Sequence, residues 1–309
     1  MWLIVAIGSY FLFAVVALID KYLLSGPLPN PKTYVFYIGV LGGGVAALIF
    51  VFGFVTIPAL PVLGLGLIAG VMRICMLLLL FAGLRLFEAS RIIPAFGGTL
   101  PVFTFLLTVF LSESREIFLP LYFLAFLFLL AGTVAISYTK DRSVTTQSFL
   151  YASGAAFFGS SSLFFSKFVY QAQPFFSGLA WLLLGAFVTS LILLMSREVR
   201  RDISKIFPKR KEAIPKSARS FPLWIFLGNQ AAGGSAVLLQ NLAIALVPFG
   251  LLPFVSAMGG IEYLALFLLT IIFLRYFPSF VKEETSRGVV IQKFLAITLI
   301  SIGLALLAL

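Results

Sequence analysis

Long apolar stretches alternate with short polar connections along this chain, and the pattern predicts ten membrane-crossing helices. A helix needs about 20 apolar residues to cross the hydrocarbon core. The predicted spans are residues 2–19, 33–55, 62–84, 89–111 and 117–138, followed by 148–170, 175–195, 221–246, 249–274 and 289–309. Hydrophobic residues make up 61% of the 309 and charged residues 11%, against about 45–50% and about 25% in soluble domains. The pattern therefore predicts an all-α integral membrane protein.

The second half of the chain repeats the first. Lys21 corresponds to Lys167 at an offset of 146, and Gly98 to Gly259 at an offset of 161. Near the end, Phe123-Leu124-Ala125 recurs as Phe294-Leu295-Ala296. Each half carries five predicted spans, and an odd number of crossings inverts the second copy. We expect two inverted five-helix repeats, residues 1–140 and 141–309, an arrangement typical of transporters.

Basic residues lie almost entirely on one side of the predicted membrane. Nineteen of the 22 Lys and Arg lie on the side of the predicted membrane that holds the connections between spans 1–2, 3–4, 5–6, 7–8 and 9–10. Nine of them are in the basic loop at 196–220, which we expect to lie against anionic lipid headgroups. Basic loops remain in the cytoplasm, so the bias places these loops inside and both termini outside. We expect a multi-pass protein of the plasma (inner) membrane, and the net charge of +11 does not indicate nucleic acid binding.

The residue inventory argues against an enzyme and a resident cofactor. The chain has no His and one Cys, Cys75, so it offers neither a Ser-His-Asp relay nor a zinc site. No G-x-x-x-x-G-K-[ST] sequence is present to hold nucleotide phosphates. We therefore expect facilitated or ion-coupled transport without cofactors or metals.

Two charged residues fall near the middle of predicted spans, Arg73 in 62–84 and Glu262 in 249–274. A charge at the bilayer centre costs at least about 2.5 kcal/mol, so each needs a partner or a wet cavity. One interpretation is that Arg73 binds an anionic or carboxylate group of the substrate while Glu262 carries a coupling proton. The alternative is a permanent Arg73–Glu262 salt bridge that fastens two helices.

Further polar and aromatic residues share helical faces with these charges. Neutral amides are concentrated in span 221–246, at Asn229, Gln230, Gln240 and Asn241. We expect Asn229, Gln230 and Asn241 to contact a polar substrate, together with Tyr10, Tyr263 and Thr104. Asp20, at the end of the first span, is expected to anchor a helix end.

Prolines and glycines mark possible bends. Pro94 and Pro101 interrupt span 89–111, and proline in a helix removes a hydrogen bond and bends the axis. Together with Gly97 and Gly259 they form small-residue stripes that suit a gate, although a static packing kink gives the same pattern.

Two segments resemble the drug/metabolite transporter superfamily, EamA-like branch. They are ASRIIPAFGGTLPVFTFLLTVFLSES, with Glu113 after the helix, and its second copy LLQNLAIALVPFGLLPFVSAMGG. The resemblance implies a central cavity between two inverted repeats and the export or exchange of metabolites. Glu262 replaces the proline found at this position in the first copy, and relatives keep both termini in the cytoplasm, opposite to the charge bias here.

We therefore expect a secondary transporter or exchanger for a small polar metabolite, amino-acid-like or another organic anion or zwitterion, working by alternating access. A coupling proton or an exchanged solute would be its second partner, and the most apolar spans, 117–138 and 289–309, offer a surface for a homodimer. The alternatives are a flippase for lipids or lipid-linked sugars and a non-transporting membrane scaffold.

Overall fold

The computed structural model describes residues 1–25, 30–87, 89–112, 118–137, 145–206, 223–276 and 287–308, and within them every regular element is a helix. The first half contains α1 (Trp2–Ser25), α2 (Pro31–Val51), α3 (Leu60–Leu86), α4 (Ala89–Leu111) and α5 (Pro120–Ser137). The second half contains α6 (Thr146–Ala172), α7 (Phe175–Ile192), η2 (Leu193–Met195), α8 (Arg197–Ile206), α9 (Leu223–Leu246), η4 (Phe249–Leu251), α10 (Leu252–Ala257), α11 (Gly259–Tyr276) and α12 (Arg287–Ala308).

Five described segments are long and apolar enough to cross a membrane. They are Trp2–Asp20, Pro31–Val51, Leu60–Leu86, Phe175–Met195 and Phe249–Leu266. Shorter apolar helices occupy Ala95–Leu111, Pro120–Ala135 and Phe294–Leu307. The all-helical architecture and these spans indicate a protein embedded in a membrane.

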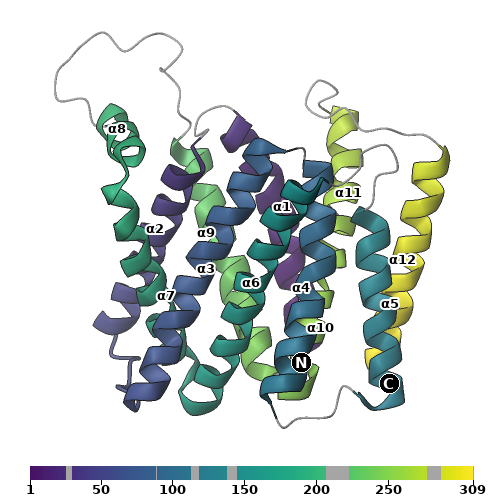
Figure 1. Cartoon of the computed structure of the whole chain (residues 1–309), viewed down its shortest axis with the longest axis horizontal. Helices are drawn as coiled ribbons and strands as arrows, with labels where there is room; N and C mark the ends of the chain where they lie inside the picture. The colour runs from purple at the N-terminus through teal and green to yellow at the C-terminus, as the bar shows by residue number, and fades with distance from the viewer. Residues whose placement is uncertain are drawn as a thin grey trace.

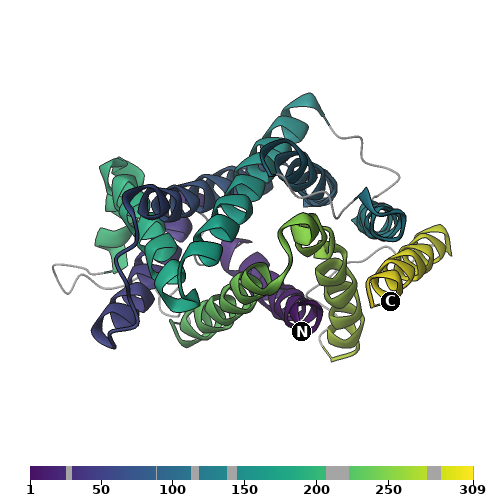
Figure 2. The same cartoon turned by 90° about the horizontal axis from the view of Figure 1, so that it is seen from below.

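The long helices lie roughly parallel in one bundle (Figure 1). The N and C marks lie toward the same face of the bundle, which we name the lower face after its place in Figure 1, and α8 lies at the opposite, upper face. Seen along the bundle in Figure 2, α5 and α12 form a pair at one edge. Helix α1 ascends from the lower face and α6 descends towards it, so these two helices run in opposite directions (Figure 1).

Helix packing is strongest for a few pairs. Helix α3 packs mainly against α6 and α7, α1 against α9 and α11, and α5 against α12. Lipid tails supply no hydrophobic drive for helix association, so close approach of backbones at small residues stabilises such pairs. A Cβ built on Gly70 of α3 would lie 2.1 Å from the Leu182 carbonyl oxygen of α7. A Cβ on Gly185 of α7 would lie 2.2 Å from the Leu67 carbonyl oxygen of α3, so this interface requires glycine on both sides.

Two segments differ from the sequence prediction. The span 249–274 is not one helix, because the chain turns at Met258 between α10 and α11. The region 196–220 is not entirely a loop, because Arg197–Ile206 forms α8. Charged positions dominate α8, but its Val199 is fully buried, which explains why a short polar segment is held as a helix at the bundle surface. Residues 207–222 lie outside the described part of the chain.

Candidate functional site

The break between α10 and α11 is the clearest irregularity in the membrane-spanning part of the described chain. An interrupted helix leaves backbone carbonyls that protein groups must satisfy, because lipid cannot. Two side chains do so here. The Tyr10 hydroxyl donates to the Val255 carbonyl oxygen at 2.5 Å, and Thr133 Oγ1 donates to the Ala257 carbonyl oxygen at 2.9 Å. Side chains of α1 and α5 therefore stabilise the break by donating hydrogen bonds to its carbonyl groups.

Gly260 explains how α5 comes so close to the break. A Cβ on this residue would lie 2.5 Å from Thr133 Oγ1. Any larger side chain would push α5 away and remove the donor to Ala257. The two consecutive glycines, Gly259 and Gly260, thus mark the point where the chain is interrupted.

Glu262 lies in the first turn of α11, directly after the break. A helix N-terminus carries a partial positive charge that stabilises a carboxylate. Tyr10 lies close enough to Glu262 for electrostatic interaction, and its hydroxyl is also within hydrogen-bonding reach of the Gln240 side chain of α9. Tyr263 interacts electrostatically with both Glu262 and Tyr10. The structure thus brings together Glu262, Tyr263 and Tyr10, which the sequence singled out, with Gln240.

Gly97 of α4 borders this group. A Cβ there would lie 2.8 Å from the Tyr263 hydroxyl oxygen, so glycine is what admits the tyrosine ring beside α4. Gly259 faces Tyr10, with an ordinary contact distance of 3.9 Å. Pro94 and Pro101 both lie inside α4, and Pro101 is buried.

Arg73 belongs to a second group, which joins α3, α6 and α9. It interacts electrostatically with Tyr170, whose hydroxyl donates to Asn241 Oδ1 at 2.8 Å. One turn before Tyr170, Lys167 Nζ donates to the carbonyl oxygens of Ala245 and Val247 at 3.1 and 2.5 Å. A cation there satisfies the last carbonyls of α9 and interacts favourably with the helix dipole.

Arg73 and Glu262 do not form a salt bridge with each other. Among residues whose side chains are described, the ion pair within 4.0 Å is Lys32–Glu198. Both Arg73 and Glu262 are partly exposed. The permanent fastening considered from the sequence is absent from this structure.

Two predicted binding residues use their polar groups locally. Thr104 is fully buried and its Oγ1 donates to the Leu100 carbonyl oxygen at 2.9 Å. Asn241 donates through Nδ2 to the Val237 carbonyl oxygen at 2.8 Å while accepting from Tyr170. The hydrogen bonds of these two residues lie within or between the helices around the candidate site.

A third polar group, at the junction of α1, α2 and α9, contains a residue whose role the sequence did not reveal. Asp20 Oδ1 accepts hydrogen bonds from the Tyr34 hydroxyl and from Asn229 Nδ2. Gln230 Nε2 donates to the Tyr34 hydroxyl oxygen at 3.3 Å. One of the predicted amides, Asn229, thus bonds a carboxylate that the sequence assigned to a helix end, and a second, Gln230, bonds the tyrosine beside it. The sequence contains both the Asp20 carboxylate and the amides of α9, but only the folded structure shows that they pair.

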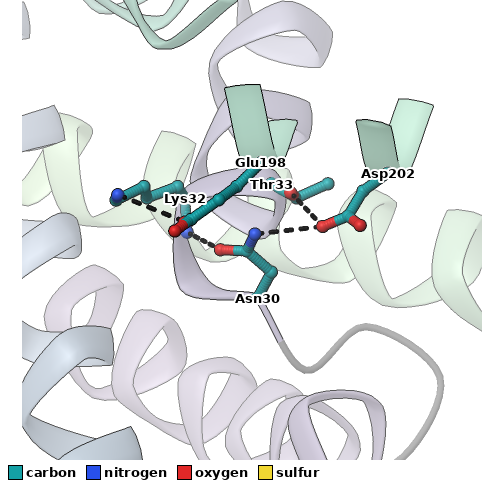
Figure 3. Close-up of polar contacts among 5 residues, drawn as sticks. All are labelled: Asn30, Lys32, Thr33, Glu198 and Asp202. Carbon is teal, nitrogen blue, oxygen red and sulfur yellow. Dashed lines mark hydrogen bonds and ion pairs between the residues drawn. The ribbon is translucent and has the colours of Figure 1, made fainter. Parts of the chain in front are cut away.

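Each face of the bundle also carries a hydrogen-bond network that joins the two halves of the chain. In the upper-face network, Asp202 Oδ2 of α8 accepts from Asn30 Nδ2 at 3.0 Å and from Thr33 Oγ1 at 3.1 Å (Figure 3). Beside them, Lys32 Nζ lies 3.2 Å from Glu198 Oε2 (Figure 3). Glu198 and Asp202 are four residues apart, so both reach the start of α2 from one face of α8.

The lower-face network is neutral. Ser177 Oγ of α7 donates to the Thr56 carbonyl oxygen at 3.0 Å and accepts from the Thr56 backbone N–H at 3.1 Å. Trp181 Nε1 donates to the same carbonyl oxygen at 3.2 Å, and Thr56 Oγ1 donates to Gln173 Oε1 at 2.5 Å. The link between α2 and α3 is thereby held against α7.

Comparison with known proteins supports the fold. No protein-family model matches the chain, and no curated protein matches it. A solved structure described as "Crystal structure of protein" is similar to 98% of this chain over 95% of its own length, with a TM-score of 0.66 and 18% sequence identity. At that identity the likeness shows a shared fold over nearly the whole chain.

Proposed function

We propose that this protein is a secondary transporter or exchanger for a small polar metabolite, and that it works by alternating access. The observation that carries the proposal is the α10–α11 break, with Glu262 in the turn that follows it and Tyr10, Gln240 and Tyr263 beside it. Transporters form substrate and ion sites at discontinuous helices near the bilayer midplane, where irregular backbone lines a cavity. A helix bundle with only a structural role does not need an interrupted helix with a carboxylate beside the interruption.

The charges suggest the substrate class. Arg73 presents a planar guanidinium suited to a carboxylate or another planar anion, and Glu262 presents a carboxylate suited to an amine or a proton. Since these two side chains do not pair with each other, both are available to a ligand. This arrangement favours an amino-acid-like zwitterion or an organic anion, with amides and tyrosine hydroxyls as further hydrogen-bonding groups.

Helix packing supports the alternating-access part of the proposal. If the halves are inverted repeats, the contact of α1 with α9 corresponds to that of α6 with α3, and both contacts are extensive. The contact of α3 with α7 would correspond to that of α9 with α2, yet the first is close and the second slight. Such asymmetry between related interfaces is what one conformation of a rocking transporter would show.

We further propose membership of the drug/metabolite transporter superfamily, EamA-like branch, and a plasma membrane location with α8 on the cytoplasmic side. The two resembling segments support the first proposal. The exposed Arg197, Arg200 and Arg201 of α8 support the second, because basic segments are retained in the cytoplasm.

Thermal unfolding of the purified protein tests the function. A ligand that binds only the folded state raises the apparent melting temperature. We expect a carboxylate-bearing metabolite among amino acids, sugar phosphates and dicarboxylates to raise it, and we expect Arg73→Gln to abolish that rise. Gly64→Ala serves as the matched control, because nothing lies within 4 Å of a Cβ at that position of the same helix. A panel in which no compound shifts wild-type protein, or in which Arg73→Gln and Glu262→Gln leave every shift intact, would contradict the proposal.

A further inference from the structure

The Asp20 carboxylate is held entirely by neutral donors. Its Oδ1 accepts from the Tyr34 hydroxyl and from Asn229 Nδ2. Tyr34 is itself fully buried and also accepts from Gln230. Hydrogen bonds to an ionised carboxylate stabilise its charge but do not neutralise it. The cluster therefore carries a net negative charge at the junction of three helices.

Asn229 has an acceptor with no partner. Its side chain is 1% exposed, and Oδ1 has no hydrogen-bond donor in the described structure. Leaving a buried polar atom unpaired costs about 1–3 kcal/mol. Native structures keep few such atoms, and each one points to strain or to a missing ligand.

Among the described side chains, no charged group supplies Asp20 with a counter-charge. Helix α1 packs against α9 and α11, and Tyr34 reaches it from α2. Of the titratable groups of α2, Tyr34 bonds Asp20 and Lys32 pairs with Glu198 of α8, while the buried Tyr37 hydroxyl has no partner in the described structure. From α11, Glu262 interacts electrostatically with Asp20 and supplies no positive charge. From α9 come the amides Asn229 and Gln230, and no Lys or Arg with a described side chain pairs with Asp20.

The negative charge and the unpaired acceptor both indicate that the site binds a small cation, and the candidates are a metal ion and a proton. The described residues include no group of three or more His, Cys, Asp or Glu side chains that could hold a metal ion. A proton needs only the carboxylate. A protonated carboxyl has an O–H donor, and a primary amide can accept from that donor while its N–H donates back to the other carboxyl oxygen. Protonation would thus supply both the missing charge and the missing donor to Asn229 Oδ1.

We propose that Asp20, with Asn229 and Tyr34, forms the binding site for the coupling proton of transport. The proton adds to the free oxygen of the carboxylate, giving a neutral carboxylic acid, and no other bond is made or broken. Because the site joins α1, α2 and α9, its occupancy changes the net charge at the junction whose α2–α9 contact is slight. This assignment rests on the proposed transport function and places the proton on Asp20 in preference to Glu262.

Infrared spectroscopy tests the site without any substrate. In a pH titration of the protein in lipid nanodiscs, a carboxylic acid C=O stretching band should appear as Asp20 takes up its proton. The band should shift in D2O, be lost in Asp20→Asn and persist in Glu262→Gln. Asn229→Leu keeps the carboxyl but removes its amide partner, so the band should move to the position of a carboxyl lacking that hydrogen bond.

Asp202→Asn is the matched control, because it removes a carboxylate of α8 outside the cluster and should leave the band unchanged. Persistence of the band in Asp20→Asn, or its loss in Glu262→Gln alone, would overturn the assignment. An Asp20-dependent spectral change on exchanging choline for sodium at constant pH would also overturn it, in favour of a sodium site. Since the measurement needs no solute, a failed substrate screen with a normal Asp20 titration would reject the transport proposal while leaving the protonation site intact.

Discussion

The upper-face and lower-face networks hold corresponding parts of the chain by different chemistry. Asn30 and Gln173 each precede a proline at the start of a helix, and each is bound by a connection from the other half of the chain. On the upper face the binding groups are the exposed Lys32–Glu198 pair and the carboxylate of Asp202. On the lower face they are Thr56, Ser177 and Trp181, all neutral.

The difference indicates how each network responds to salt. Exposed ion pairs contribute about 0–1 kcal/mol and weaken with salt. The neutral network is reinforced by the glycine contact of α3 with α7, where backbones touch directly. We therefore infer that the upper-face network depends on charge and weakens with salt, whereas the lower-face network does not. The following predictions test that difference.

Gly70→Ala should have the largest effect. The added Cβ meets the Leu182 carbonyl oxygen at 2.1 Å, and a backbone atom in a packed helix cannot move aside. We expect a loss of more than about 4 kcal/mol of stability, at the severe end for single substitutions, seen as loss of monodisperse protein in fluorescence-detected size exclusion. Gly64→Ala on the same helix should be neutral or slightly stabilising, since alanine favours helix by about 0.5–1 kcal/mol. Equal behaviour of the two variants would rule out a tight α3–α7 interface.

Asp202→Ala should be next. It leaves Asn30 Nδ2 and Thr33 Oγ1 without their charged acceptor, and hydrogen bonds to charged groups are worth about 1.5–3 kcal/mol. We expect a decrease of that order in the free energy of unfolding, measured by denaturant titration in mixed micelles. Ser204→Ala is the control, because that hydroxyl is exposed and bonds only within α8. A change no greater than that of the control would mean that α8 does not hold the start of α2.

Ser177→Ala should cost somewhat less, about 0.5–1.5 kcal/mol for a neutral hydrogen bond. It removes the donor to the Thr56 carbonyl and the acceptor for the Thr56 N–H. Because no charge is involved, the loss should be the same at low and high salt. Ser235→Ala, an exposed hydroxyl bonded within its own helix, gives the reference value. A strong salt dependence of the Ser177→Ala effect would remove the distinction between the two faces.

Lys32→Gln should have the smallest effect. The side chains of this pair are 50% and 52% exposed, so the expected loss is a few tenths of a kcal/mol. High salt should abolish it, because the Debye length falls to about 3 Å at 1 M. A loss that survives 1 M salt would show that the pair is held in a less polar environment than its exposure indicates.

The sequence predicted the helices well and the break in one of them poorly. Apolar stretches of membrane length are a one-dimensional property, so α2, α3 and α7 follow directly from the pattern. The interruption at Met258 depends on Tyr10 and Thr133, which reach the freed carbonyls from other helices. A hydropathy pattern contains no information on those contacts, and the apolar run continues through the break.

The candidate site shows the same division. Glu262 and Arg73 were identifiable because charges inside apolar spans are rare and costly. Asp20 was assigned to a helix end because it lies at the boundary of its span, and only the fold brings Tyr34 and Asn229 to it. Lys167 lies inside the predicted span 148–170 and received no role from the sequence, yet its side chain is buried and bonds the end of α9. Position along a span therefore predicts the cost of a charge but not its partner.

Spin-label distance measurements test the central proposal most directly. In a Cys75→Ser background, one pair of labels at Ser204 and Trp224 would report on the upper face, and a second pair at Leu60 and Phe176 on the lower face; all four positions are exposed. Alternating access predicts two distances at each face, with Asp202→Ala lengthening the upper distance while the lower one stays short. A single unchanged distance at both faces, in wild type and in Asp202→Ala, would contradict the account.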